Sequence, residues 1–265
     1  MVGPGRPQFV LFGSSMDLMG YNLGSWAGTL ADLYIRKADV LLREYPGWNT
    51  RMALQVLDQV FPKDAAVQPS LVIVYFCSND ATNSHPSGPG VHVPLTEYVE
   101  NMKKIILHLK SLGDVTRIIC LSSPPVNEAK EAELYRKPVD GQSQSQSRTN
   151  EGCRAYAEAL IELCGVMDVE AINLWSAVGK RDDWANACLV DGIHLSEQGS
   201  KVVVEEILKV LKKKDEEVQW EPSLYWLSMP NEFSEGSSFF VVAPGGETVN
   251  PGLHPSSWQL EWMNT

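Results

Sequence analysis

The sequence of 265 residues has no long apolar run, no closely paired cysteines and few positive charges. No segment approaches the roughly 20 apolar residues that a membrane-spanning helix needs. The five cysteines include no Cys-x-x-Cys pair, so their spacing indicates neither a zinc site nor a disulfide framework. Lys and Arg number 22 against 33 Asp and Glu, for a net charge of -11. This charge argues against nucleic acid as a partner, because the phosphates would be repelled.

The first residues, MVGPGRPQFVLFGSS, lack the features of a secretory signal peptide, because their apolar run is short and polar residues follow at once. We therefore expect a cytoplasmic protein whose cysteines are reduced thiols. No Gly-x-Gly-x-x-Gly follows a predicted strand, which disfavours a nucleotide-binding domain. What the chain does contain is an ordinary globular composition, with 44% hydrophobic and 21% charged residues.

Short apolar runs alternate with longer amphipathic stretches along most of the chain. The runs predict strands at 8–12, 38–44, 70–76, 117–123 and 169–175. The amphipathic stretches predict helices at 24–36, 49–60, 95–112, 149–165 and 196–214. Strands that are apolar throughout are typical of a parallel sheet covered on both faces. We therefore predict an α/β fold, a three-layer α/β/α sandwich with a five-stranded parallel sheet.

Two domain-level features complete this prediction. Residues 81–94 and 124–148 are expected to form long loops, the second with a Gln/Ser repeat. Residues 1–215 form the predicted domain. Residues 216–265 contain four of the eight tryptophans but little periodicity, and they are expected to be an irregular C-terminal extension packed on that domain.

Ligands of open parallel sheets bind beyond the carboxyl ends of the strands, so the residues that follow each strand are candidates for a site. Ser15 follows the first strand, Gly47 the second and Asn79 the third. The late stretch LVDGIHLSEQGS places Asp191 three residues before His194. Taken singly, each of these residues is also common in turns and helix caps.

Two interpretations fit the late stretch. In one, Asp191 ends a loop and Ser196 caps a helix whose first turn carries Glu197. In the other, Asp191 orients His194 as a general base, which requires a nucleophile and oxyanion donors elsewhere in the chain.

The order of these residues, together with PSLVIVYF, LSSPPVNEA, RDDW, DGIHLS and WEPSLYW, resembles the GDSL/SGNH hydrolases. Within that family the chain is similar to the plant GDSL esterases related to isoamyl-acetate-hydrolysing esterase. The resemblance implies a flavodoxin-like sandwich and a serine esterase that works through an acyl-enzyme. It assigns Ser15 as the nucleophile, with Asp191 and His194 completing a catalytic triad. Gly47 and Asn79 would join the Ser15 backbone N–H as oxyanion donors.

By the same resemblance no metal or cofactor is required, and the substrate is a small-molecule ester or an acylated sugar. Residues 81–94 are polar and rich in proline and glycine, with Val91 and Val93 as their only sizeable aliphatic side chains, which predicts a short acyl group. The oligomeric state stays open. Two departures from the family pattern favour an alternative, a catalytically weakened member that binds an acylated ligand without turnover. Cys77 stands where a glycine is usual and would strain the backbone if a positive φ were needed there. Asp17 adds an acid close to the predicted nucleophile.

Overall fold

The structure is a computed structural model that describes residues 6–16, 24–35, 37–84, 90–135 and 148–212. The strands are β1 (Gln8–Gly13), β2 (Asp39–Glu44), β3 (Leu71–Tyr75), β4 (Arg117–Leu121) and β5 (Glu170–Ile172). The longer helices are α1 (Trp26–Tyr34), α2 (Thr50–Val60), α3 (Leu95–Lys110), α5 (Asn150–Val166) and α8 (Glu197–Lys212). Three shorter helices are α4 (Glu128–Tyr135), α6 (Leu174–Gly179) and α7 (Trp184–Ala187).

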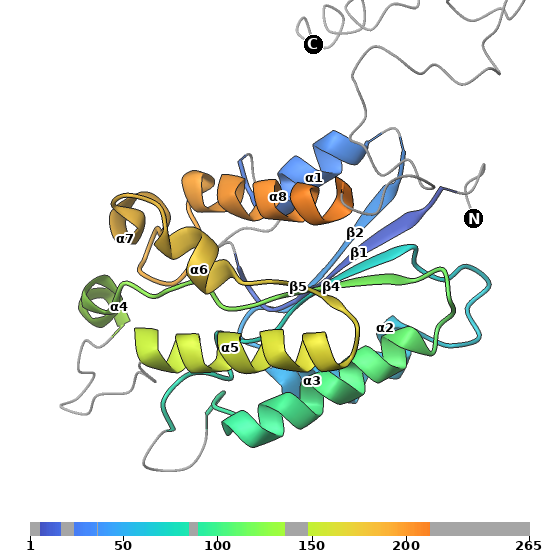
Figure 1. The fold of residues 1–265 in the computed structure, drawn as a ribbon, viewed down its shortest axis with the longest axis horizontal. Helices are drawn as coiled ribbons and strands as arrows, with labels where there is room; N and C mark the ends of the chain where they lie inside the picture. The colour runs from blue at the N-terminus through green and yellow to red at the C-terminus, as the bar shows by residue number, and fades with distance from the viewer. Residues whose placement is uncertain (1–5, 17–23, 36, 85–89, 136–147, 213–265) are drawn as a thin grey trace, which may run out of the picture. The chain divides into compact units, whose positions relative to one another are not determined.

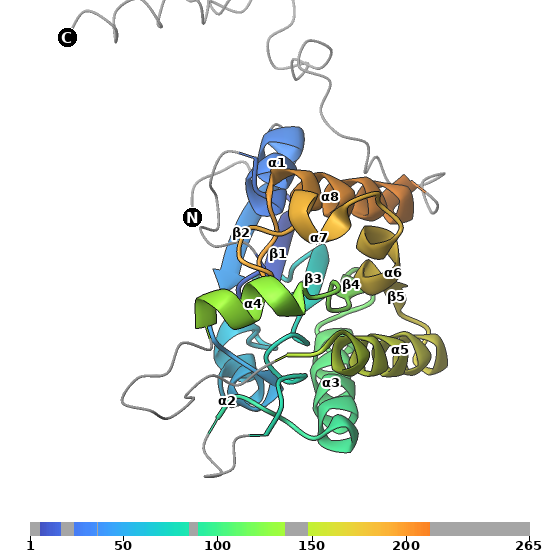
Figure 2. The ribbon, with the colours of Figure 1, turned by 90° about the vertical axis from the view of Figure 1, so that its left-hand side faces the viewer.

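The five strands form one parallel sheet in the order β2-β1-β3-β4-β5. Helices α1 and α8 cover one face, while α2, α3 and α5 cover the other (Figure 1). The predicted three-layer α/β/α sandwich is therefore confirmed. Its strand order is the flavodoxin-like one, in which the connections leave β1 and β3 in opposite directions and open a crevice between their carboxyl ends. Helix α4 lies at this end of the sheet (Figure 2).

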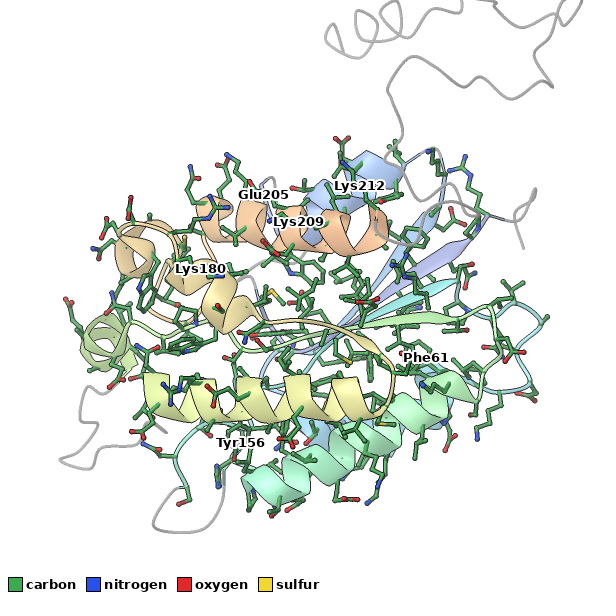
Figure 3. All side chains as sticks on the ribbon, in the orientation of Figure 1. Phe61, Tyr156, Lys180, Glu205, Lys209 and Lys212 are labelled. Carbon is green, nitrogen blue, oxygen red and sulfur yellow. The ribbon has the colours of Figure 1, made fainter. Side chains whose placement is uncertain are left out.

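Alternation along the strands divides the hydrophobic core into two parts. In β1, Val10 and Phe12 pack with α2, α3 and α5, whereas Phe9 and Leu11 pack with α1 and α8. Side chains fill the space on both sides of the sheet in Figure 3. Phe61, labelled there, belongs to the part of the core that contacts α2, α3 and α5, and Lys209 lies on α8. Because both faces are covered, every residue of β3 is buried. The edge strand β2 departs from the prediction of full burial, since none of its residues is fully buried.

Short polar side chains begin the helices that follow the strands. Ser25 accepts a hydrogen bond from the backbone of Gly28 at the start of α1. Asn49 does the same at α2, and Thr149 at α5. These bonds satisfy backbone N–H groups that lack partners in the first turn of a helix. The predicted starts of these helices are therefore correct to within about two residues, the usual uncertainty of helix ends.

Two segments differ from the sequence-based prediction. The predicted loop 124–148 contains α4, whose weakly amphipathic sequence gives little helical signal. The predicted strand 169–175 ends at Ile172, because Asn173 caps α6 by accepting a hydrogen bond from the backbone of Ser176. The predicted extension 216–265 lies outside the described residues, as does Asp17. Among the helices described, none is both long and apolar enough to cross a bilayer.

Candidate active site

Three polar side chains lie in one hydrogen-bonded line at the carboxyl edge of the sheet. Ser15 follows β1, and its Oγ lies 3.2 Å from Nε2 of His194. On the other side of the ring, Nδ1 of His194 lies 2.6 Å from Oδ2 of Asp191. The structure thus brings together residues that are 179 positions apart in the sequence.

The environment of Asp191 fixes the direction of these hydrogen bonds. Its Oδ1 accepts bonds from the backbone N–H groups of Ile193, at 2.9 Å, and His194, at 2.8 Å. A carboxylate only accepts, so Nδ1 of His194 must carry the proton that it donates to Oδ2. The opposite nitrogen, Nε2, then has a free lone pair directed at the Ser15 hydroxyl. This tautomer is the one that can remove a proton from the serine.

Backbone hydrogen bonds hold the serine and the histidine at this separation. The carbonyl of Met16, next to Ser15, accepts a bond of 2.9 Å from the N–H of Leu195, next to His194. The N–H of Met16 donates to Oε1 of Glu44, also at 2.9 Å. Met16 and Leu195 are therefore held by backbone bonds, and the approach of Ser15 to His194 does not depend on its side-chain contact alone.

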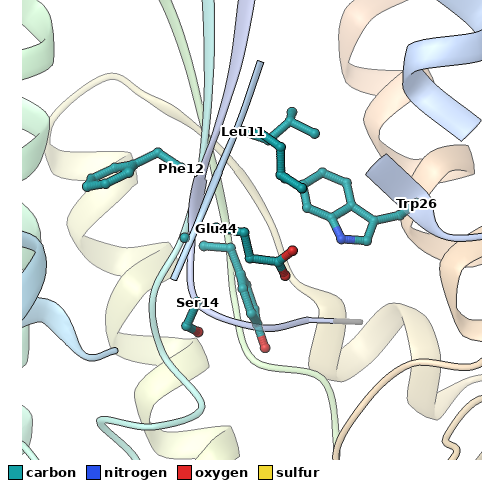
Figure 4. Close-up of a pocket in the computed structure, with 8 residues that line it drawn as sticks. Leu11, Phe12, Ser14, Trp26 and Glu44 are labelled. Carbon is teal, nitrogen blue, oxygen red and sulfur yellow. The ribbon is translucent and has the colours of Figure 1, made fainter. Parts of the chain in front are cut away.

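Glu44 ends β2 and lies in a small pocket beside apolar groups of Leu11, Leu42 and Trp26 (Figure 4). Burial raises the pKa of Glu44, an effect opposed first by the Met16 N–H and then by the nearby His194. Glu44 was not predicted as a site residue. It occupies the same strand-end position as the other candidates, so the rule that found them could also have found Glu44.

The two adjacent serines differ sharply in their surroundings. Ser14 is 2% exposed, and its Oγ has no hydrogen-bond partner among the residues that the structure describes. Ser15 is partly exposed and lies against His194. The preceding Gly13 allows β1 and β3 to approach closely, since a Cβ at this position would lie 2.5 Å from the Tyr75 carbonyl oxygen. The turn after β1 thus presents one hydroxyl and buries the other.

Gly47 and Asn79 lie on two loops that are joined by a hydrogen bond. Gly47 has φ +80, which favours glycine, and its neighbours Tyr45 and Trp48 stack with ring centroids 4.2 Å apart. Nδ2 of Asn79 donates to the Trp48 carbonyl at 2.7 Å. The loop after β2 and the loop after β3 therefore hold each other in place.

Asp80 joins the same two loops at the start of α2. Its Oδ1 accepts from the backbone N–H of Thr50 at 3.0 Å and from the Thr50 hydroxyl. Its Oδ2 is buried and has no partner in the described part of the chain. Burial raises the pKa of Asp80 to about 7, although both bonds from Thr50 lower it. Asp80 is thus a structural group that positions the loop carrying Asn79.

Arg148 is a second residue that sequence reasoning did not select. Its Nε donates to the Ser78 carbonyl at 2.9 Å, and its Nη2 donates to Oδ1 of Asn79 at 2.6 Å. It lies 69 residues after Asn79, and no motif or periodicity in the sequence connects the two.

Cys77 does not have the positive φ that would strain the backbone at this position. In the described residues, positive φ outside glycine occurs only at Asp168 and Asp183. The Cys77 side chain is completely buried in the core that contains α3. Cysteine therefore fits this position without the left-handed conformation that would require glycine. The argument from strain for a weakened enzyme is wrong.

The late stretch makes the contacts that both interpretations require. The Oγ of Ser196 accepts a bond of 3.3 Å from the Gly199 N–H, as a helix cap does. Asp191 also contacts the His194 ring, as described above. The capped helix α8 therefore begins at Glu197, a short distance after the histidine, and anchors its loop.

A serine hydroxyl, an imidazole and a carboxylate in one line are the arrangement that serine hydrolases use. Here the line stands at the carboxyl edge of a flavodoxin-like sheet. The chain belongs to the GDSL-like Lipase/Acylhydrolase family, whose family model matches residues 11–202. The resemblance inferred from the sequence is thereby confirmed, and with it the expectation of a carboxylic ester hydrolase.

Named relatives place the chain within this family. It is 54% identical over 260 residues to a GDSL esterase/lipase of Oryza sativa subsp. japonica, covering 98% of this chain and 97% of the relative. It is 32% identical to an isoamyl acetate-hydrolyzing esterase 1 homolog of Bos taurus, covering 78% and 82% of the two chains. The fold resembles that of a lipase/acylhydrolase from Enterococcus faecalis, with a TM-score of 0.61 and 17% identity over 78% of this chain and 96% of that one.

Proposed function

We propose that the chain is a serine esterase that hydrolyses short-acyl carboxylic esters through an acyl-enzyme. The observation that carries this proposal is the line from Ser15 Oγ through the His194 ring to Asp191, with distances of 3.2 Å and 2.6 Å. Family membership supplies the reaction class, and the line supplies residues suited to perform it.

In the first half of the proposed reaction, His194 Nε2 takes the proton of Ser15 as its Oγ attacks the carbonyl carbon. The carbonyl oxygen becomes an oxyanion, which the backbone N–H groups of Ser15 and Gly47 and the amide of Asn79 would stabilise. Asp191 keeps the ring in the required tautomer and stabilises the imidazolium. The tetrahedral intermediate then collapses, the alcohol leaves with the proton from Nε2, and the acyl group stays on Oγ.

In the second half, a water molecule gives its proton to Nε2 and attacks the acyl carbon. The same donors would stabilise the second oxyanion. Collapse breaks the bond to Ser15 Oγ, returns the proton to the serine and releases the acid. The chain's own side chains thus account for every proton transferred in the cycle.

The preference for short acyl groups rests on the loop that follows β3. Of the sizeable aliphatic residues in 81–94, Val93 is completely buried in the core and cannot line a substrate channel. A longer acyl chain gains binding energy, about 0.8 kcal/mol per CH₂, only where it finds apolar surface. We therefore propose acetyl to butyryl esters of alcohols or sugars as the substrate class.

A cytoplasmic location stays a prediction from the sequence.

Turnover of p-nitrophenyl acetate tests the proposed function. An acyl-enzyme whose hydrolysis is slower than its formation gives an initial burst of nitrophenol of about one equivalent per active site. Ser15→Ala should abolish both the burst and the steady-state rate, whereas Ser14→Ala should keep most of both. Undiminished turnover by Ser15→Ala would show that another group is the nucleophile.

A further inference from the structure

The side-chain amide of Asn79 is oriented by hydrogen bonds to Arg148 and to Trp48. Its Oδ1 accepts from Nη2 of Arg148 at 2.6 Å, and its Nδ2 donates to the Trp48 carbonyl at 2.7 Å. A side-chain amide has two N–H donors on Nδ2, so the Trp48 carbonyl takes one and a second remains. Under the proposed function, this second N–H is the one that would donate to the oxyanion.

The two partners permit only one orientation of this amide. If the group turned over, Nδ2 would face the guanidinium, so that two donors met. Oδ1 would then face the Trp48 carbonyl, so that two acceptors met. Each mismatch would leave a buried polar group unsatisfied, which strongly disfavours the reversed orientation. Asn79 is only 6% exposed, so water is poorly placed to compensate.

Arg148 also fixes the backbone that carries this amide. Its Nε donates to the Ser78 carbonyl at 2.9 Å, so the guanidinium makes hydrogen bonds to two successive residues of the turn. The guanidinium is always charged, and its fixed fork suits such paired contacts better than a lysine ammonium does. Its positive charge lies on the carbonyl side of the amide and draws electron density away from Nδ2, which makes the remaining N–H a stronger donor.

We infer that Arg148 is a positioning residue for the oxyanion site, acting through Asn79 and without touching the substrate. The inference rests on the proposed function, in which Asn79 binds the oxyanion. Its effect should appear in the transition state, where the charge on oxygen develops, and hardly in the ground-state complex.

The central test is Arg148→Met in the full-length protein, measured with p-nitrophenyl acetate. Small displacements of catalytic groups cost up to about 100-fold in rate, so we expect kcat to fall by about 10- to 100-fold while KM changes little. Arg148→Lys, which keeps the charge but not the fork, should lose less. Arg154→Met is the matched control, because Arg154 lies on α5 and pairs with the exposed Glu158 at 3.3 Å. It should behave like the unmodified protein.

A double-mutant cycle separates positioning from general support of the fold. In an Asn79→Ala background the amide is gone, so Arg148→Met should lower kcat by less than a further factor of about three. Millimolar guanidinium should partly restore kcat to Arg148→Met but not to the double variant. If Arg148→Met does not fold, the same comparison is made with Arg148→Lys at an unchanged thermal midpoint.

Equal losses of kcat in both backgrounds, or no loss in the Arg148 variants, would overturn the inference while leaving the esterase proposal intact. Full activity of Asn79→Ala alone would instead contradict the oxyanion role of Asn79. These two failures are therefore distinguishable.

Discussion

Replacing Asp191 by asparagine tests the proposed role of the carboxylate through the tautomer of the histidine. In the structure Oδ1 of Asp191 accepts two backbone N–H groups, from Ile193 and His194. An asparagine must keep its single oxygen at that position, because its NH₂ group cannot accept these bonds. Nδ2 would then face Nδ1 of His194 in place of the carboxylate oxygen that now lies 2.6 Å away.

An N–H donor at this position forces the ring into the wrong tautomer. Nδ1 must accept, so the proton moves to Nε2, and Nε2 can no longer take the proton of Ser15. Asparagine is also neutral, so the negative charge proposed to stabilise the imidazolium is lost. That charge is buried, because Asp191 is 6% exposed. The same change in a well-studied serine protease lowers kcat by about 10⁴, which corresponds to about 5 kcal/mol of transition-state stabilisation. We expect a loss of kcat of that order here.

The assay is steady-state hydrolysis of p-nitrophenyl acetate, with the thermal unfolding midpoint measured in parallel. Asp182→Asn is a suitable control, because Asp182 lies nearby in the sequence and is exposed. It should change neither quantity appreciably. A loss of less than about tenfold in Asp191→Asn, with the fold intact, would refute the argument from the tautomer.

Three further predictions concern stability and specificity. Because burial raises the pKa of Asp80 to about 7, the folded chain keeps a proton there that the unfolded chain releases near pH 4. The free energy of unfolding should therefore fall as the pH rises from about 4 to 7, and urea titrations should show a smaller fall in Asp80→Asn. Cys77→Gly should not raise kcat and should cost about 1–3 kcal/mol of stability by urea unfolding, because it removes a buried side chain and adds backbone freedom. In a series of p-nitrophenyl esters, kcat/KM should be highest for acetyl to butyryl groups, and a rise out to decanoyl would contradict the short-acyl proposal.

The sheet could be predicted because its strands are mostly apolar and separated by amphipathic helices. Full burial of β3 between two helical layers gives a run of five buried residues, Leu71–Tyr75, with no polar interruption. The strand predicted at 169–175 extends beyond the observed end of β5. Its apolar letters continue past Ile172 into α6, and the start of that helix is marked only by Asn173. Periodicity cannot separate a buried strand from a short buried helix.

The candidate site could be located because parallel sheets gather their strand ends at one edge. Position after a strand points to Gly47, Asn79 and the pair Ser14 and Ser15, and the family resemblance distinguishes Ser15 from Ser14. Arg148 could not be found in this way, since it precedes a helix and reaches Asn79 across 69 residues. Contacts of this kind depend on how loops fold over the sheet edge, which local sequence patterns do not determine.

The central claim is that Ser15 is the nucleophile, and covalent labelling tests it most directly. A fluorophosphonate should add one label per chain, and peptide mass spectrometry should place it on Ser15. Ser15→Ala should not be labelled, whereas Ser14→Ala should be, because the Ser14 hydroxyl is buried and it is the Ser15 hydroxyl that lies against the histidine. A label on Ser14, or undiminished labelling of Ser15→Ala, would contradict the account.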